Sequence, residues 1–140
     1  MKNSIHPCLW FNNNALEAAE FYCSVFTNSK ITTNTPMVVN FELNGQKFMG
    51  LNGGPHFSFN EAVSFVVECD TQEEIDYFWN KLTAGGSESM CGWLKDKYGV
   101  SWQIVPRILG QLMADANRSQ RVVQAFMKMK KFDIDTLLKA

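Results

Sequence analysis

The chain lacks an excess of charge of either sign and has no long hydrophobic run. Its 140 residues carry 13 Lys and Arg against 14 Asp and Glu, a net charge of −1 at pH 7. Because no basic face is implied, we expect no nucleic-acid partner. No apolar stretch approaches the roughly 20 residues that span a bilayer, and the N-terminal residues lack the apolar core of a signal peptide. We therefore expect a cytoplasmic protein with no membrane segment.

Cysteine and histidine are few and scattered. The four cysteines form no C-x-x-C pair, and zinc-site spacings are absent. The two histidines, His6 and His56, lie far apart in the sequence. The chain also lacks a G-x-S-x-G elbow, a P-loop and an H-E-x-x-H helix. None of these familiar catalytic constellations is therefore expected.

What the chain does contain is one pattern of elements that occurs twice. The first copy predicts a strand, a helix and three further strands at residues 6–11, 15–26, 30–35, 37–43 and 46–51. The second copy predicts a strand at 62–69, a helix from about 72 to 84, a short segment to 92, and strands at 93–96 and 100–105. The Asn44-Gly45 pair between two strands is a strong hairpin signal.

Polar residues mark the expected helix starts. Asn14 is predicted to cap the first helix, with Glu17 reaching back to it. Thr71 and Glu74 have the spacing of a capping box for the second helix.

The last part of the chain reads as helical. It begins with a short amphipathic turn, and a longer helix is expected from Asn117 or Arg118. The apolar face of that helix is predicted to contain Val122, Ala125, Phe126 and Met129.

A βαβββ unit covers one face of its sheet with its own helix, and the other face curls open. Two such units side by side enclose a cup, and cups bind small molecules. We therefore predict an α+β fold in which two paired βαβββ modules, residues 5–57 and 61–106, form a curved mixed-sheet cup. Residues 107–140 add a C-terminal helix, and the 140 residues are expected to form a single domain.

Short stretches along nearly the whole chain match the pattern of a known family. They are residues 7–11, 18–22, 41–46, 51–57, 91–96, 99–106 and 127–131. Together they resemble the PhnB-like branch of the vicinal oxygen chelate superfamily, which includes glyoxalases, bleomycin-resistance proteins and extradiol dioxygenases. This branch is often labelled as a 3-demethylubiquinone-9 3-methyltransferase domain. The resemblance implies the glyoxalase-like fold and a homodimer.

The resemblance also implies where a metal would be held. Metal-using members place His, Gln or Glu ligands on the first strand of each module and the last strand of the second. The last-strand position falls on Gln103, a neutral and poorer ligand. The other two positions fall on Pro7 and on the Ala-Val pair at 62–63, while His6 and Glu61 are one step away and expected on the opposite face. We predict no metal site and no cofactor, although weak binding by His6 or Gln103 stays open.

We interpret the chain as a small-molecule-binding protein of the glyoxalase/bleomycin-resistance type. The expected pocket residues are Leu9, Phe11, His56, Ser101 and Gln103. The tryptophans at 10, 93 and 102 are expected mainly to pack the core.

One alternative is an enzyme on the same scaffold, either a metal-assisted lyase or isomerase or the methyltransferase of the family label. No Gly-rich cradle for S-adenosylmethionine supports the latter. Another alternative is a protein that works through its surface.

Overall fold

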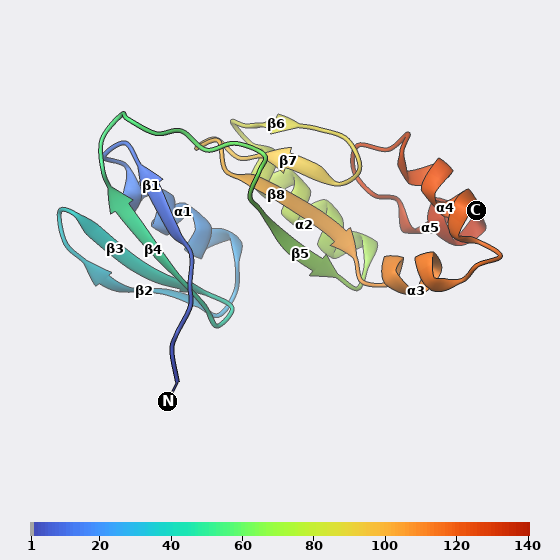
Figure 1. The fold of residues 1–140 in the computed structure, drawn as a ribbon, viewed down its shortest axis with the longest axis horizontal. Coiled ribbons are helices and arrows are strands. Elements are labelled where there is room, and N and C mark those ends of the chain that lie inside the picture. Colours follow the sequence, from blue (N-terminus) through green and yellow to red (C-terminus); the bar gives the residue numbers. More distant parts are fainter. Residues whose placement is uncertain (1) are drawn as a thin grey trace. The chain divides into compact units, whose positions relative to one another are not determined.

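The structure is a computed structural model that describes residues 2–140. The chain forms two compact units, one ending at Phe59 and the other comprising Asn60–Ala140 (Figure 1). Each unit contains a four-stranded mixed sheet and at least one helix, so the predicted α+β class is confirmed. Among the described residues, no helix combines the length and the apolar character needed to cross a membrane.

The first unit has the predicted order of a strand, a helix and three strands. Its elements are β1 (Cys8–Phe11), α1 (Ala15–Val25), β2 (Ser29–Asn34), β3 (Val38–Leu43) and β4 (Gln46–Asn52). The strands lie in the order β1-β4-β3-β2, with β1 parallel to β4 and the other pairs antiparallel. The predicted hairpin joins β3 to β4, and Asn44 and Gly45 have the positive φ angles, 49° and 88°, that this tight turn needs.

The second unit repeats this topology. Its elements are β5 (Ser64–Cys69), α2 (Gln72–Thr83), β6 (Ser87–Glu88), β7 (Trp93–Lys95) and β8 (Ser101–Pro106). The order β5-β8-β7-β6 matches that of the first sheet, and β5 is parallel to β8 as β1 is to β4. The twofold repeat predicted from the sequence is therefore confirmed.

Helix α1 covers one face of the first sheet with small and aromatic side chains. Its buried residues are Ala15, Ala18, Ala19, Tyr22 and Val25. The Phe41 ring stacks on the rings of Tyr22 and Phe48 at centroid distances of 6.1 and 5.3 Å. Gly50 of β4 lets the helix approach, because a Cβ there would lie 3.2 Å from the Cβ of Ala15. Burying each such aromatic side chain contributes about 1.5–3 kcal/mol, so this layer holds α1 on its sheet.

The two helix starts differ from each other. Asn14 makes no side-chain cap, so that prediction was wrong, and the first N–H of α1 is bound instead by Asn52 Oδ1 of β4 at 2.9 Å. With φ −120° and ψ 27°, Asn14 lacks the extended backbone from which a cap side chain reaches the first turn. Thr71 does cap α2 by accepting from the Glu74 N–H at 3.2 Å, while Glu74 accepts from the Asp70 N–H.

The C-terminal part is helical but contains three short helices: α3 (Leu109–Ala114), α4 (Ser119–Phe126) and α5 (Ile134–Lys139). The predicted longer helix reaching Met129 is therefore wrong. After Phe126 the chain leaves the helix, and the carbonyls of Met129 and Lys130 accept hydrogen bonds from the N–H groups of Cys91 and Gly92, each at 2.8 Å. These contacts with the β6–β7 loop compete with the next helical turn.

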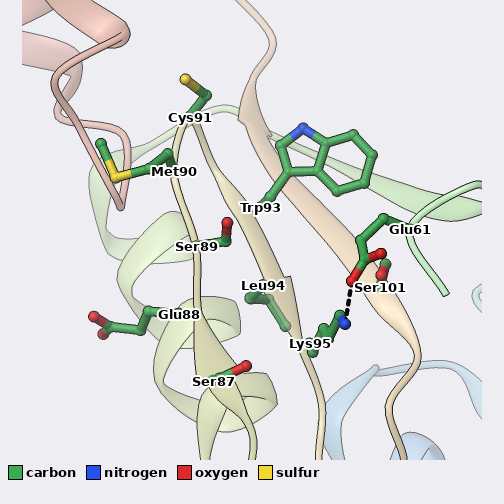
Figure 2. A pocket seen from close by; sticks show the side chains of 10 residues that line it. All are labelled: Glu61, Ser87, Glu88, Ser89, Met90, Cys91, Trp93, Leu94, Lys95 and Ser101. Atoms are coloured by element: carbon green, nitrogen blue, oxygen red, sulfur yellow. Dashed lines mark ion pairs between the residues drawn. The ribbon is translucent and has the colours of Figure 1, made fainter.

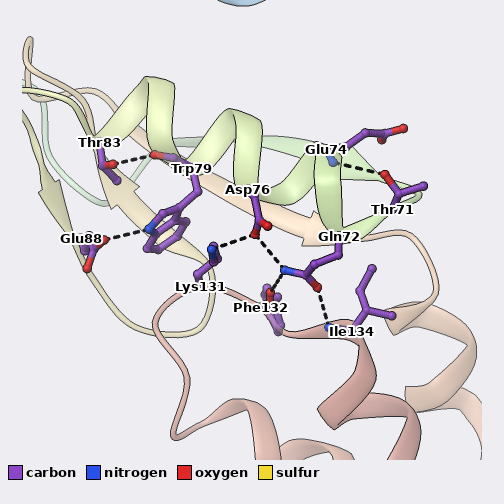
Figure 3. A network of polar contacts seen from close by, with 10 residues as sticks. All are labelled: Thr71, Gln72, Glu74, Asp76, Trp79, Thr83, Glu88, Lys131, Phe132 and Ile134. Carbon is purple, nitrogen blue, oxygen red and sulfur yellow. Dashed lines mark hydrogen bonds and ion pairs between the residues drawn. The ribbon is translucent and has the colours of Figure 1, made fainter.

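Side chains of α2 hold the segment before α5 (Figure 3). Gln72 donates to the carbonyl of Phe132 at 2.9 Å and accepts from the N–H of Ile134 at 2.8 Å. Asp76 accepts from Gln72 and pairs with Lys131 at 2.8 Å. The C-terminal extension is thus joined to the start of α2 by directional bonds as well as by packing.

Candidate ligand pocket

The second sheet has one face toward α2 and one face away from it. Glu88 of β6 accepts a hydrogen bond from Trp79 Nε1 of α2 at 2.9 Å. Leu94 is opposite Glu88, and Trp102 is opposite Leu94, so this row of side chains faces α2. Because side chains alternate along a strand, the neighbouring rows point to the other face, which we call the open face.

One row of the open face is made of three serines and a lysine. Ser87 of β6 is opposite Lys95 of β7, and Lys95 is opposite Ser101 of β8. Ser101 is in turn paired with Ser64 of β5. We call these four residues the hydroxyl row. Cross-strand neighbours of this kind have Cβ atoms about 4.5–5.5 Å apart, so one small ligand group can contact two of them.

A cavity of about 600 Å³ lies along part of this row (Figure 2). Its walls come from β6, the β6–β7 loop, β7, the first residue of β8 and the segment before β5. The lining residues are Glu61, Ser87, Glu88, Ser89, Met90, Cys91, Trp93, Leu94, Lys95 and Ser101. All of them belong to the second unit. Aliphatic, aromatic and charged groups therefore meet in one pocket.

Glu61 and Lys95 form an ion pair within the pocket (Figure 2). The hydrogen bond from Lys95, a backbone hydrogen bond and the lysine charge together lower the pKa of Glu61. The Glu61 side chain is 61% exposed and that of Lys95 40% exposed. Pairs this accessible to water contribute only about 0–1 kcal/mol, so Glu61 can leave Lys95 at small cost.

Ser101 is the unusual member of the hydroxyl row. The residue is 1% exposed, and its hydroxyl oxygen has no hydrogen-bond partner among residues 2–140. A buried polar group without a partner costs about 1–3 kcal/mol, and such groups are rare in native proteins. Ser101 is also part of the cavity wall, so this unpartnered hydroxyl belongs to a residue beside the space that a ligand would fill.

The residues predicted to form the pocket belong to both units, and each is described within its own unit. Ser101 lines the cavity. Gln103 is half-buried in the next row of the open face, opposite Trp93, and donates to Ser64 Oγ at 2.9 Å. His56 lies exposed in a turn of the first unit, and His6 is exposed before β1.

Leu9 and Phe11 are in the core of the first unit. They are 7% and 2% exposed, and a Cβ added at Gly50, which is paired with Leu9, would touch both Phe11 and Ala15 of α1. These two side chains thus lie on the face covered by α1. Their part in the pocket stays a prediction. Because both side chains are buried, that part is limited to supporting the shape of the sheet.

Of the ten lining residues only Ser101 was predicted, and Glu61, Trp93 and Lys95 are among those that were not. Lys95 is identified only by strand register, which places it opposite Ser101. Its neighbour Asp96 has a structural role, since its carboxylate accepts from the N–H groups of Tyr98 and Val100 and from Trp102 Nε1 at 2.8–3.1 Å. Trp102 is buried in the core as expected, whereas Trp93 lines the cavity.

Solved structures with this fold include members of the glyoxalase/bleomycin-resistance superfamily. The PhnB protein from Bacillus cereus is 37% identical, with 74% of this chain and 99% of that chain covered and a TM-score of 0.68. PA1353 from Pseudomonas aeruginosa is 20% identical over 75% and 98%, with a TM-score of 0.64. FosX from Listeria monocytogenes, a fosfomycin-resistance protein solved with Mn(II) and sulfate, is 11% identical over 76% and 90%, with a TM-score of 0.57.

The fold is therefore shared with proteins described as glyoxalase-related or as glyoxalase/bleomycin-resistance proteins. A family model described as 3-demethylubiquinone-9 3-methyltransferase matches residues 3–105. The chain belongs to this family, in agreement with the resemblance seen in its sequence. No curated protein matches the chain. The matched residues stop before α3, so the three C-terminal helices lie outside the shared region.

The pocket residues do not fit a divalent metal of the kind that glyoxalase-like enzymes use. Such a metal needs about three imidazole, carboxylate or thiolate ligands. Among residues 2–140, no three His, Cys, Asp or Glu side chains are grouped so that they could hold one. On β8, Gln103 already donates to Ser64 and is flanked by Trp93 and Val66.

Proposed function

We propose that the protein binds a small molecule in the pocket on the open face of the second sheet. One observation carries this proposal: Ser101, whose buried hydroxyl has no partner among the described residues, is part of the wall of a cavity of about 600 Å³. Ligand pockets typically measure about 300–1,000 Å³ and combine apolar walls with a few polar groups. Trp93 and Met90 provide such apolar walls here.

The same proposal includes the setting of the pocket. Both units act as one glyoxalase-like domain, in a cytoplasmic homodimer that binds its ligand without a metal or cofactor. Apolar side chains exposed on the single chain support self-association, because large exposed apolar surface favours burial against a partner. Val63, which precedes β5, is one such residue and is 65% exposed.

The family description supports one alternative, methyl transfer from S-adenosylmethionine. A Gly-rich loop between a strand and a helix commonly cradles that cofactor. In this chain α1 follows Asn12-Asn13-Asn14 and α2 follows Asp70-Thr71, so neither loop contains glycine. We therefore favour binding over methyl transfer.

A thermal-shift screen of the full chain against small metabolites tests the proposal, with S-adenosylmethionine as one member. A ligand present at a hundredfold its Kd adds about 2.7 kcal/mol of stability, which is readily measured. We expect hits that lose their effect in Trp93→Ala and keep it in Trp10→Ala, a matched change in the first unit. Hits unaffected by Trp93→Ala would contradict the pocket, and stabilisation by S-adenosylmethionine would favour the alternative.

A further inference from the structure

We infer that the pocket recognises an oxyanion, a carboxylate or phosphonate group, which binds between Lys95 and Ser101. In the absence of this ligand group, Glu61 forms the ion pair with Lys95. The inference rests on the proposed function and adds the chemical class of the ligand. It also assigns Glu61 a role as an internal competitor.

The donors of the hydroxyl row select an acceptor. Lys95 presents an ammonium group, which only donates hydrogen bonds, and the Ser101 hydroxyl next to it has a proton to donate. A carboxylate or phosphonate is an acceptor at every oxygen, and it matches the Lys95 and Ser101 donors better than a neutral amide, which also brings N–H groups.

The charges of the pocket lead to the same class. Glu61 and Glu88 are the two carboxylates that line the cavity, but Glu88 is bonded to Trp79 on the α2 side. Glu61 is thus the carboxylate bound to Lys95, which shows that an anionic oxygen fits at this position. Because Glu61 is well exposed, replacing it with a ligand oxyanion returns it to water and leaves Lys95 paired.

The body of the ligand has its own place on the open face. Trp93 is two residues before Lys95 on the same strand, so both side chains point to that face. Trp93 lines the cavity and is half-buried, which leaves part of its indole ring accessible. An aromatic or apolar body attached to the oxyanion can pack on this ring.

Three simple probes test the inference by NMR titration of the full chain: benzoate, phenylphosphonate and the neutral benzamide. The readout is the indole N–H resonance of Trp93, assigned with Trp93→Phe. We expect saturable shifts with benzoate and phenylphosphonate, and binding of benzamide weaker by about tenfold or more, because charge-assisted hydrogen bonds are lost. The ranking of benzoate and phenylphosphonate tells which oxyanion the pocket prefers.

Charge variants separate the pocket from general electrostatics. Lys95→Met should weaken benzoate binding by about tenfold, whereas Glu61→Gln should strengthen it by about twofold to fivefold. Lys30→Met is the matched control, since Lys30 is paired with Glu42 in the first unit at 4.0 Å. It removes the same charge and should leave benzoate binding unchanged.

Ser101→Ala adds a readout that does not depend on binding. It should weaken benzoate binding by about fivefold while the melting temperature stays equal or rises, because a buried hydroxyl without a partner is removed. Equal binding of benzoate and benzamide, or unchanged binding in Lys95→Met, would overturn the oxyanion inference. So would the absence of any Trp93 shift with all three probes. The metabolite screen decides the proposed function separately, since a neutral ligand that depends on Trp93 would support it.

Discussion

Individual residues of this chain fix the backbone where the pocket loop meets the C-terminal extension. Gly92 has φ +82°, and a Cβ there would lie 2.4 Å from the Phe132 ring and 2.8 Å from the carbonyl oxygen of Ile104. Gly45 has a similar φ of +88°, but its Cβ would meet nothing within 4 Å. Both glycines thus have a positive φ, but only Gly92 has neighbouring atoms where a Cβ would lie.

This pair gives a prediction at the residue scale. Gly45→Ala should cost about 1–2 kcal/mol, the penalty of left-handed backbone for a residue with a Cβ. Gly92→Ala should cost about 3 kcal/mol or more, because overpacking adds to the same penalty. Urea unfolding of both variants measures the difference, and equal losses would show that Phe132 does not press on Gly92.

The site was only partly predictable at this scale. Ser101 and Gln103 were predicted through the resemblance, and both lie on the open face. Lys95 was missed because its position beside Ser101 follows from strand register, which the sequence does not state. Leu9 and Phe11 were expected at the pocket, but β1 begins at Cys8 and alternation turns both toward α1.

At the scale of elements, one glutamine joins α2 to the extension. The amide of Gln72 bonds Asp76, the carbonyl of Phe132 and the N–H of Ile134. We predict that Gln72→Ala speeds amide hydrogen exchange in α5 and lowers stability by about 1–3 kcal/mol, since buried backbone groups lose their partners. Glu73→Ala, an exposed change one residue along α2, is the control. Unchanged exchange in α5 would mean that packing alone holds the extension.

The ion pair in the same network predicts a dependence on pH. The hydrogen bond from Lys131, followed by that from Gln72, lowers the pKa of Asp76. A carboxyl with a lowered pKa stabilises the folded state above its ordinary pKa, and this contribution is lost as the pH falls through its folded value. Between about pH 4 and pH 2, protection of α5 from exchange should therefore fall in the wild type and fall less in Asp76→Asn. If α5 protection fell equally with pH in the wild type and in Asp76→Asn, the Asp76 carboxylate would have no role in holding α5.

The order of elements could be predicted, because hydrophobic alternation, the Asn44-Gly45 turn and the Thr71 cap act locally. The start of the C-terminal helix α4 could be predicted too, but its end could not. Val122 and Phe126 have helical spacing, yet the chain leaves the helix so that Met129 and Lys130 can bond Cys91 and Gly92. Such contacts between distant segments override local preference and have no sequence signature.

At the scale of the whole molecule, the proposed homodimer is open to direct measurement. We predict that light scattering gives twice the mass of one chain at micromolar concentration. Val63→Glu should shift the protein toward one chain, because a buried unpaired charge at an interface is costly. Met127→Glu, at a residue 62% exposed in the extension, should leave the mass unchanged. A wild type that stays monomeric on concentration would refute the dimer.

The contact between Gly92 and Phe132 has a practical consequence for any shortened form of the protein. The residues common to the family stop at 105, and a fragment cut there looks complete by comparison with relatives. It would nevertheless lose the ring that covers Gly92 and the two carbonyls that tether the loop carrying Met90 and Cys91. Ligand affinities measured on such a fragment would describe a pocket whose β6–β7 loop has lost its contacts with the C-terminal extension. Residues 127–134 therefore belong in every version used for binding work.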